Sequence, residues 1–354
     1  MSEKLFLQHK ILPLHSKNKK TILYILYSME QSLYPLKFMP LFKNKIWGGN
    51  KLKDMGVNYS PLPNCGELWT LSDLEGQETL VQNGYLAQCT LNEVLEMYAD
   101  ELVGEKCFKD FGTTFPLLFK IIDAADKLSI QVHPDNNYAY RHKLGNGKTE
   151  MWYVIDADPI SQIISGFNQK VGKAQVINRV RDNNLIDILN SESVEKGDVF
   201  FVDAGTVHAL GKGCMVAEIQ QSSDCTFRLY DWDRVDKDGK KRQLHVENAL
   251  NVLDYTPVSN SAKTHYHCHI NETVELVECP YFTTNLLHLT QGLQKDYSML
   301  DSFVAYQCVE GSGFVNCLGQ RIPIKQAEVM LLPAITDLVT IEPNKVIKLL
   351  EVYL

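Results

Sequence analysis

Short apolar and β-branched runs, separated by turn residues, recur along most of the chain. In the run 129–135 (SIQVHPD), Gln131 and His133 are two positions apart, so they point to one face of an extended strand. Glu150 opens the run MWYVI, whose aromatic and β-branched residues are typical of a strand facing a packed interior. The glycine-containing turn at 145–148 (GNGK) joins these two runs and predicts that the two strands pair.

A third segment combines a strand, a tight turn and a returning strand. VFFV at 199–202 is the first strand, DAGT at 203–206 is the turn, and VHAL at 207–210 is the returning strand. His208 therefore lies just past a tight turn, where its ring can be aimed in a defined direction. The pattern predicts a mainly β protein.

Helical spacing is limited to a few stretches. Thr90 and Glu93 form a capping box, and the apolar residues after them recur with helical spacing through Leu102. A second helical patch lies between residues 171 and 195, and a charged turn after Arg234 runs into a short helix. We therefore expect a few helices around a β framework.

The composition is that of an ordinary globular protein. The residues are 45% hydrophobic and 22% charged. At 354 residues, the chain is long enough for two domains. With 35 basic and 43 acidic residues, the net charge of −8 argues against nucleic acid or an anionic membrane as the main partner. A local basic pocket for a phosphate group remains compatible with this balance.

Cysteine usage indicates a reducing compartment. The nine cysteines form no C-x-x-C pair and their number is odd, which argues against a disulfide framework or a thiolate zinc site. Reduced thiols in a cytoplasmic protein are the simplest interpretation.

The first 28 residues differ from the rest. Basic residues precede the apolar run TILYILYS at 21–28, which is shorter than a membrane-spanning helix and is followed by no small-residue cleavage site. We expect the functional start at Met29, with 1–28 an upstream extension or a loose tail; a targeting role is the alternative.

The strand-like segments bring together residue types that bind metals. Two histidines and one glutamate, with Gln131 as a further candidate, form a nitrogen and oxygen ligand set without thiolates. Zinc accepts imidazole and carboxylate ligands, and three protein ligands leave a position for water or substrate. This pattern is typical of a catalytic metal site.

The third segment also matches the second motif of the cupin family, G-x5-P-x-G-x2-H. The matching residues are Gly197, Gly205 and His208, with Asp203 in place of the proline. Cupins are jelly-roll barrels that hold a metal inside. More narrowly, the runs FPLLFKIIDAADKLSIQVHPD, GKTEMWYV, AGTVHALGKG and EIQQSSDCTFRLYDWDR resemble the type I phosphomannose isomerases, in particular the short bacterial form. The likeness extends from about Leu36 to the C-terminus.

This resemblance implies two cupin-type jelly-roll barrels, with helices packed on a catalytic N-terminal barrel. It implies a zinc-dependent aldose–ketose isomerase that interconverts mannose 6-phosphate and fructose 6-phosphate. It assigns one zinc ion per chain to four ligands, which are Gln131, His133, Glu150 and His208.

The resemblance also assigns residues to the substrate. Arg228 matches the catalytic arginine of the family, while Lys120, Lys148 and Glu218 match positions that line the substrate pocket. The run GELWTLSD departs from the family pattern, so Glu67 receives no role.

The chemistry explains these residue types. Moving a proton between C1 and C2 of an open-chain sugar passes through an enediolate, whose charge a zinc ion and a guanidinium can stabilise. The lysines can bind the phosphate as point charges. The base stays open between Glu218, a zinc-bound water and a lysine with a lowered pKa.

From the residues alone, Lys148 could instead be a solvated turn lysine. Arg228 could instead be an ion-pair partner of a nearby aspartate, whose candidates are Asp224, Asp231 and Asp233.

The remaining chain predicts a second barrel. We place the catalytic domain at 29–255 and a degenerate cupin domain at 256–354, where AEVMLLPAITDL aligns with GDVFFVDAGTVH and puts Leu338 at the position of His208. That barrel should lack a metal. In the preceding linker, three alternating histidines carry no acidic partner and are expected to be exposed; they are His265, His267 and His269.

The sequence therefore predicts an isomerase acting on a small sugar phosphate, monomeric or homodimeric, without nucleic-acid or membrane partners. The alternative is a cupin that binds a sugar phosphate as a sensor, or one with other chemistry such as a metal-dependent dioxygenase.

Overall fold

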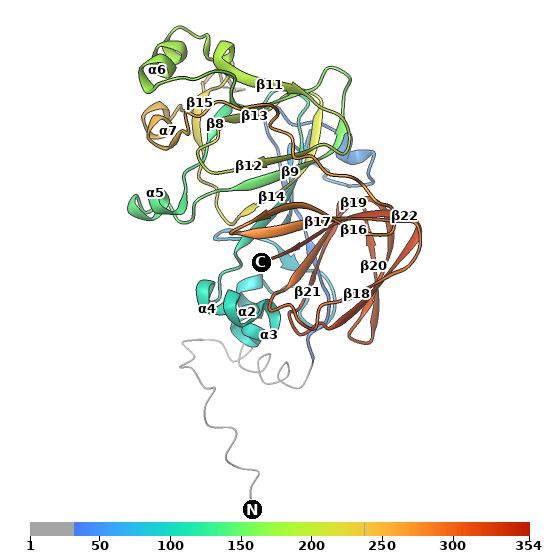
Figure 1. The fold of residues 1–354 in the computed structure, drawn as a ribbon. Coiled ribbons are helices and arrows are strands. Elements are labelled where there is room, and N and C mark those ends of the chain that lie inside the picture. Colours follow the sequence, from blue (N-terminus) through green and yellow to red (C-terminus); the bar gives the residue numbers. More distant parts are fainter. Residues whose placement is uncertain (1–31, 237) are drawn as a thin grey trace, which may run out of the picture. The chain divides into compact units, whose positions relative to one another are not determined.

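Antiparallel β-sheets are the main elements of the computed structural model, which describes residues 32–236 and 238–354 (Figure 1). The expected extension at 1–28 lies outside the described residues. The architecture below is that of the unit Tyr34–Leu354.

Two facing sheets form the N-terminal barrel. One runs in the order β12 (Val199–Val202), β9 (Glu150–Ala157), β14 (Cys214–Gln221), β7 (Leu117–Asp123), β3 (Glu67–Leu71) and β2 (Leu41–Lys43). The other runs in the order β11 (Leu189–Ser193), β10 (Gln162–Phe167), β13 (His208–Leu210), β8 (Ile130–Val132) and β15 (Phe227–Tyr230). A small hairpin pairs β4 (Asp73–Leu74) with β5 (Gln77–Glu78).

The C-terminal barrel is one continuous sheet that also takes up two early strands. Its main path is β16 (Thr273–Cys279), β17 (Phe282–Leu289), β22 (Leu338–Tyr353), β19 (Val304–Cys317), β21 (Val329–Leu332), β1 (Leu36–Met39) and β6 (Leu80–Val81). Two further strands pair beside this path, β18 (Leu293–Asp296) with β22 and β20 (Gln320–Lys325) with β19. The pairing of β1 with β21 sets Leu36 opposite Leu331, so the start of the described chain is hydrogen-bonded into the C-terminal barrel. The domain boundary near residue 255 stays a prediction.

The α-helices lie in two groups. The first contains α2 (Leu91–Tyr98), α3 (Asp100–Val103) and α4 (Glu105–Phe111). The second contains α5 (Asn136–Arg141), α6 (Lys173–Arg181) and α7 (Val246–Val252). Two short 3-10 helices also occur, η1 (Lys51–Lys53) and η2 (Leu185–Ile188). The capping box is confirmed, because the Glu93 amide donates to Thr90 Oγ1 at 3.2 Å and the Glu93 carboxylate accepts from the Thr90 amide at 2.9 Å. The first helix is shorter than predicted, since Ala99 has a φ of 47° and breaks it before α3 begins.

The predicted pairing of the strands at Gln131 and Glu150 is wrong. β8 pairs with β13 and β15, whereas β9 pairs with β12 and β14 in the facing sheet. Pro134 has no amide proton to continue the first strand. Asp135 then caps the unpredicted helix α5 by accepting from the Tyr138 amide at 2.7 Å. The segment between the two runs therefore carries the chain from one sheet to the other.

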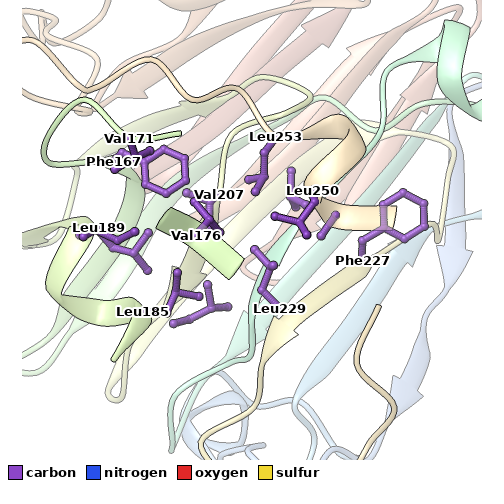
Figure 2. Close-up of a cluster of buried hydrophobic side chains, with 14 of the residues drawn as sticks. Phe167, Val171, Val176, Leu185, Leu189, Val207, Phe227, Leu229, Leu250 and Leu253 are labelled. Carbon is purple, nitrogen blue, oxygen red and sulfur yellow. The ribbon is translucent and has the colours of Figure 1, made fainter. Parts of the chain in front are cut away.

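A buried apolar cluster packs α6, η2 and α7 on the outer face of the β8–β13–β15 sheet (Figure 2). Its strand members alternate with polar residues, as Val207 and Ala209 flank His208. In the same way Phe227 and Leu229 flank Arg228. Because side chains of a strand point alternately to its two faces, this packing turns the polar residues toward the barrel interior.

Thr90→Ala removes the side-chain acceptor at the start of α2. We expect the free energy of unfolding to fall by about 1 kcal/mol, measured by urea denaturation. Thr114, an exposed threonine outside any helix, provides a matched control as Thr114→Ala, which should leave the unfolding curve unchanged. Equal curves for wild type and Thr90→Ala would show that the cap contributes nothing.

Candidate functional site

Three neighbouring strands place three of the predicted residues in one row. In the antiparallel register, Gln131 on β8 lies opposite His208 on β13 and opposite Arg228 on β15. Directly opposite residues share a face of the sheet, so these side chains enter the barrel together. On the facing sheet, Glu150 lies opposite Gln220, and Glu218 lies opposite Lys120.

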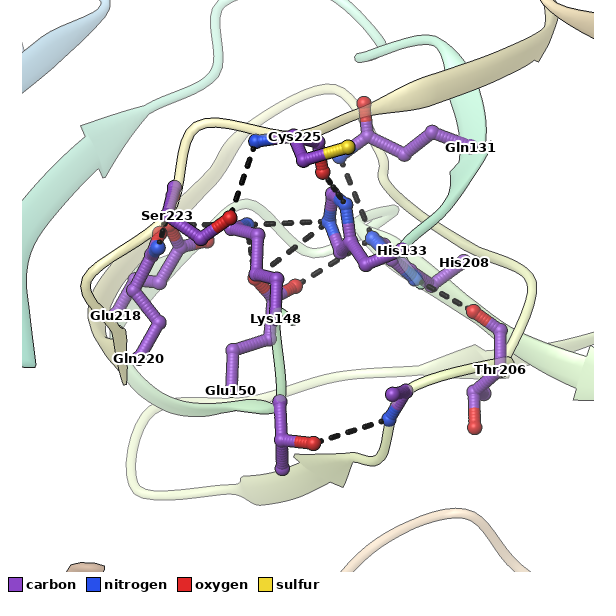
Figure 3. A network of polar contacts seen from close by, with 12 residues as sticks. Gln131, His133, Lys148, Glu150, Thr206, His208, Glu218, Gln220, Ser223 and Cys225 are labelled. Carbon is purple, nitrogen blue, oxygen red and sulfur yellow. Dashed lines mark hydrogen bonds and ion pairs between the residues drawn. The ribbon is translucent and has the colours of Figure 1, made fainter. Parts of the chain in front are cut away.

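Hydrogen bonds to backbone carbonyls orient both histidines (Figure 3). The Nδ1 atom of His133 is 2.8 Å from the carbonyl oxygen of Cys225, and that of His208 is 2.8 Å from the carbonyl oxygen of Thr206. A carbonyl only accepts, so each Nδ1 carries the proton and each Nε2 presents a lone pair. Burial lowers the pKa of both rings, to about 4 for His208, which keeps them neutral.

Both lone pairs are directed at the carboxylate of Glu150, which is completely buried. Its Oε2 lies 3.7 Å from His133 Nε2, and its Oε1 lies 3.4 Å from His208 Nε2. No hydrogen-bond donor reaches Oε1 among the described residues. Burial first, and the nearby charge of Glu218 second, raise the pKa of Glu150 to about 7. The Lys148 ammonium and the Gln131 amide nitrogen approach the two Nε2 lone pairs, so the buried acceptor left without a donor is Glu150 Oε1, which a cation between the three groups would satisfy.

The donor set fits a divalent metal ion. The ligating atoms of His133, Glu150 and His208 lie within 4.8 Å of one another, and this is the one such group of histidine, cysteine and acidic residues in the described part of the chain. Imidazole and carboxylate suit zinc and similar cations. The Gln131 amide nitrogen lies 3.3 Å from His208 Nε2. As a ligand, Gln131 would have to turn this amide so that its oxygen faces the ion, because the amide nitrogen has no lone pair to give.

Lys148 is buried and not the solvated turn lysine that its position in the sequence allowed. Its ammonium group contacts Glu150 Oε2 and lies 3.1 Å from His133 Nε2. It therefore supplies a positive charge beside the three candidate ligands, where it offsets the charge of the buried carboxylate.

A second buried ion pair lies beside the first. Lys120 donates to Glu218 Oε1 at 3.0 Å and to Gln220 Oε1 at 2.7 Å, while the Trp152 indole donates to Glu218 Oε2 at 2.9 Å. Burial opposes ionisation of Glu218, but the ammonium groups of Lys120 and Lys148 outweigh it and lower its pKa to about 2. Glu218 is thus a fixed anion with both oxygens occupied.

Arg228 has no acidic partner in the described part of the chain. Its Nε donates to Ser129 Oγ at 3.2 Å and its Nη1 to the carbonyl of Gln243 at 2.9 Å. The alternative of an ion pair with a nearby aspartate is not realised, since the carboxylate of Asp231 is taken by Arg234 and Arg242. The guanidinium remains available to an anion.

These side chains surround a pocket of about 260 Å³. The predicted residues on its wall are Lys120, Gln131, Lys148, His208, Glu218 and Arg228, whereas His133 and Glu150 lie behind that wall. Further wall residues include Lys45, Trp47, Glu67, Ser129, Trp152, Asp224 and Arg242. A more open hollow along residues 53–62 is lined by that loop alone and lacks such convergent chemistry.

Known proteins resemble this chain over most of its length. A model of the catalytic domain of type I phosphomannose isomerases matches residues 35–157. Mannose-6-phosphate isomerase ManA of Bacillus subtilis is 37% identical over 84% of this chain and 93% of its own length. The mannose-6-phosphate isomerase of Streptococcus mutans is 36% identical over 84% of this chain and 92% of its own. The chain belongs to the type I phosphomannose isomerase family.

Solved structures agree with this membership. The crystal structure of the mannose 6-phosphate isomerase from Bacillus subtilis superimposes with a TM-score of 0.80 at 31% identity, covering 91% of this chain and all of the other. The predicted mainly β cupin fold is thereby confirmed, and the chain is an isomerase by family. Among the described residues, every helix falls short of the length and apolar character needed to cross a bilayer.

The wall residues that sequence reasoning missed have weak local signals. Trp152 has an aromatic strand composition on either side of it, and only the structure shows its indole on Glu218. Glu67, given no role before, pairs with Lys45 at 3.0 Å and accepts from Trp69 Nε1 at 2.8 Å. The three linker histidines are exposed, as predicted.

Lys148→Met leaves the carboxylate of Glu150 buried without its ammonium partner. In chelator-treated protein we expect a loss of about 3 to 5 kcal/mol in the free energy of unfolding. With a divalent metal added, the loss should be much smaller, because the ion supplies the missing charge. Urea denaturation with and without metal measures both values.

The matched control is Lys120→Met, which removes the other buried ammonium but leaves Glu218 with the Trp152 donor. Its stability loss should not depend on metal. If metal changed both variants equally, Lys148 would have no special relation to the metal ligands.

Proposed function

We propose that this chain is a zinc-dependent aldose–ketose isomerase that interconverts mannose 6-phosphate and fructose 6-phosphate through an enediolate. The similar proteins of Bacillus subtilis and Streptococcus mutans are named mannose-6-phosphate isomerases. The observation that carries the proposal is the meeting of two neutral imidazoles and one carboxylate, with His208 on the wall and His133 and Glu150 behind it, at a pocket that also holds the Arg228 guanidinium without an ion pair.

The metal would be held, one ion per chain, by His133, Glu150 and His208, with Gln131 as the fourth ligand. When bound, zinc supplies a fixed positive charge that polarises the sugar carbonyl and favours negative charge on its oxygen. The carbonyl oxygens that bind both Nδ1 protons hold the imidazoles in the tautomer that this requires.

Lys120, Lys148 and Glu218 are proposed to form the polar wall against which the substrate binds. Both lysines already neutralise buried carboxylates, so their ammonium groups suit neutral hydroxyl or carbonyl oxygens better than a dianionic phosphate. Glu218 is a poor proton acceptor in this arrangement, since both its oxygens are hydrogen-bonded and its pKa is lowered to about 2. We therefore propose that Glu218 positions Lys120.

Arg228 is proposed as the catalytic arginine. Its neighbour across the strand pair is Gln131, so its guanidinium enters the pocket beside the metal ligands. A guanidinium keeps its charge at any pH of interest and can stabilise an oxyanion with two donors at once. Ser129 and Gln243 hold Nε and Nη1, which fixes the plane of the fork.

His208→Ala removes a metal ligand, so isomerase activity should fall by about a hundredfold or more. A coupled assay of fructose 6-phosphate formation from mannose 6-phosphate measures this. A chelator should abolish wild-type activity and zinc should restore it, because the proposed reaction needs the positive charge of the ion at the sugar oxygen.

The control is His265→Ala, which removes an exposed histidine of the linker and should leave activity and zinc content at wild-type levels. Full activity of His208→Ala, or activity that survives complete zinc removal, would contradict the proposal. Iron in place of zinc, with no isomerisation, would favour the dioxygenase alternative.

Arg228→Lys keeps the charge but replaces the forked donors with one ammonium. We expect kcat to fall about a hundredfold with zinc content unchanged. Arg181→Lys, on the exposed helix α6, is the conservative control. A near-normal kcat for Arg228→Lys would assign Arg228 a structural role.

A further inference from the structure

The cations around the pocket fall into two groups by their partners. Near the metal ligands each ammonium is matched by a carboxylate, as Lys120 is by Glu218 at 3.0 Å and Lys148 by Glu150. Lys45 at the rim likewise pairs with Glu67 at 3.0 Å. This part of the wall is close to electrically neutral.

Another part of the wall carries excess positive charge. Arg228 has no carboxylate within ion-pair distance in the part of the chain that the structure describes. Beside it, Arg242 shares the carboxylate of Asp231 with Arg234, which also pairs with Asp126 at 3.5 Å, so the three arginines have two carboxylates between them. Burial is the main cause that lowers the pKa of Arg228, and the positive charge of the nearby Arg242 is the second. Two like charges close together each disfavour the charged form of the other.

Asp231 holds Arg242 in a defined orientation. This carboxylate is 5% exposed and accepts from Arg242 Nε at 2.7 Å and from Arg242 Nη2, in a two-point contact. It also accepts from Arg234 Nη2 at 2.6 Å. The contact uses one edge of the Arg242 guanidinium and leaves Nη1 for another acceptor.

The backbone around Arg242 is tied to the strand that carries Arg228. The carbonyl of Gln243 accepts from Arg228 Nη1, and the His245 amide donates to the Arg228 carbonyl at 2.7 Å. The two guanidiniums therefore belong to one rigid assembly on the same pocket.

From these observations we infer that Arg242, held by Asp231, binds the phosphate group of the substrate, next to the catalytic Arg228. A phosphate dianion has several terminal oxygens and pairs well with forked guanidinium donors. This inference rests on the proposed function for the identity of the sugar, but the phosphate subsite itself rests on the charges and contacts of the wall.

The spacing of the strands suits this placement. Arg228 and His208 lie on either side of Gln131 in adjacent strands, so their Cα atoms are about 10 Å apart. The substrate carries its phosphate on C6 and reacts at C1 and C2, at opposite ends of a six-carbon chain. Phosphate on Arg242 would therefore leave the reacting carbons near Arg228 and the metal ligands.

Asp224, the one acidic wall residue that forms no ion pair among the described residues, does not oppose this placement. Asp224 is exposed, and its charge acts on Lys43 and Lys120. The acidic group that acts on Arg228 is Asp231. The negative charge of Asp224 thus lies toward the lysine side of the pocket.

The test uses Arg242→Gln in the full, zinc-loaded chain. Calorimetric titration with inorganic phosphate at constant ionic strength should show binding weakened about 10- to 100-fold. The KM for mannose 6-phosphate should rise by a similar factor with kcat changed only a few-fold, because the residue acts on binding and not on the reacting carbons. Arg242→Lys, which retains the charge, should recover part of the loss.

The matched control is Lys241→Gln, which removes the same charge from the adjacent exposed residue, whose partner Asp233 also lies at the surface. Its phosphate affinity and KM should stay within about twofold of wild type, since an exposed charge at this distance is screened.

Phosphate affinity of Arg242→Gln within twofold of wild type would overturn the inference, as would an equal loss in Lys241→Gln. The two proposals fail separately. If the wild type converted no sugar phosphate yet bound inorganic phosphate through Arg242, the isomerase assignment would fall and the phosphate subsite would stand.

Discussion

The buried carboxylate of Glu150 is the constraint around which the N-terminal barrel is arranged. An ionised carboxylate at zero exposure is costly unless a positive charge lies next to it. Lys148 supplies one such charge. A metal ion bound by the Nε2 atoms of His133 and His208 would supply a second, because both atoms lie within 3.7 Å of the carboxylate. The carbonyl acceptors behind each imidazole, the indole on Glu218 and the paired lysines all serve to keep this group of charges fixed in an apolar barrel.

Strand alternation explains how the barrel can be both apolar and polar. The residues that flank Gln131, His208 and Arg228 are apolar and pack under α6 and α7. The three polar side chains therefore point into the barrel. The same packing that stabilises the helices therefore sets the row of catalytic candidates. A one-residue slip in any of these strands would bury the wrong face.

Much of this was predictable from the sequence, and the failures have physical causes. The spacing of Gln131 and His133 and the turn before His208 were sufficient to identify strands and ligand candidates. The register was not predictable, because Pro134 and the Asp135 cap divert the chain into α5 and send Gln131 and Glu150 to different sheets. Arg242 was missed for a related reason. Arg242 lies in a charged turn, and such a composition is typical of solvent-exposed surface. Only the contact between Arg228 and the neighbouring backbone brings Arg242 to the pocket.

The strand pair of β1 and β21 has a consequence for how the protein forms during synthesis. Leu36 leaves the ribosome early but pairs with Leu331, so this contact cannot close until nearly the whole polypeptide has been made. Until then β1 exposes an apolar strand with an open edge, which is the kind of segment that associates with other nascent chains. Such a long sequence separation also slows folding after release. From this one pairing we expect that chaperones assist the nascent polypeptide. We also expect that C-terminally shortened products are recovered poorly.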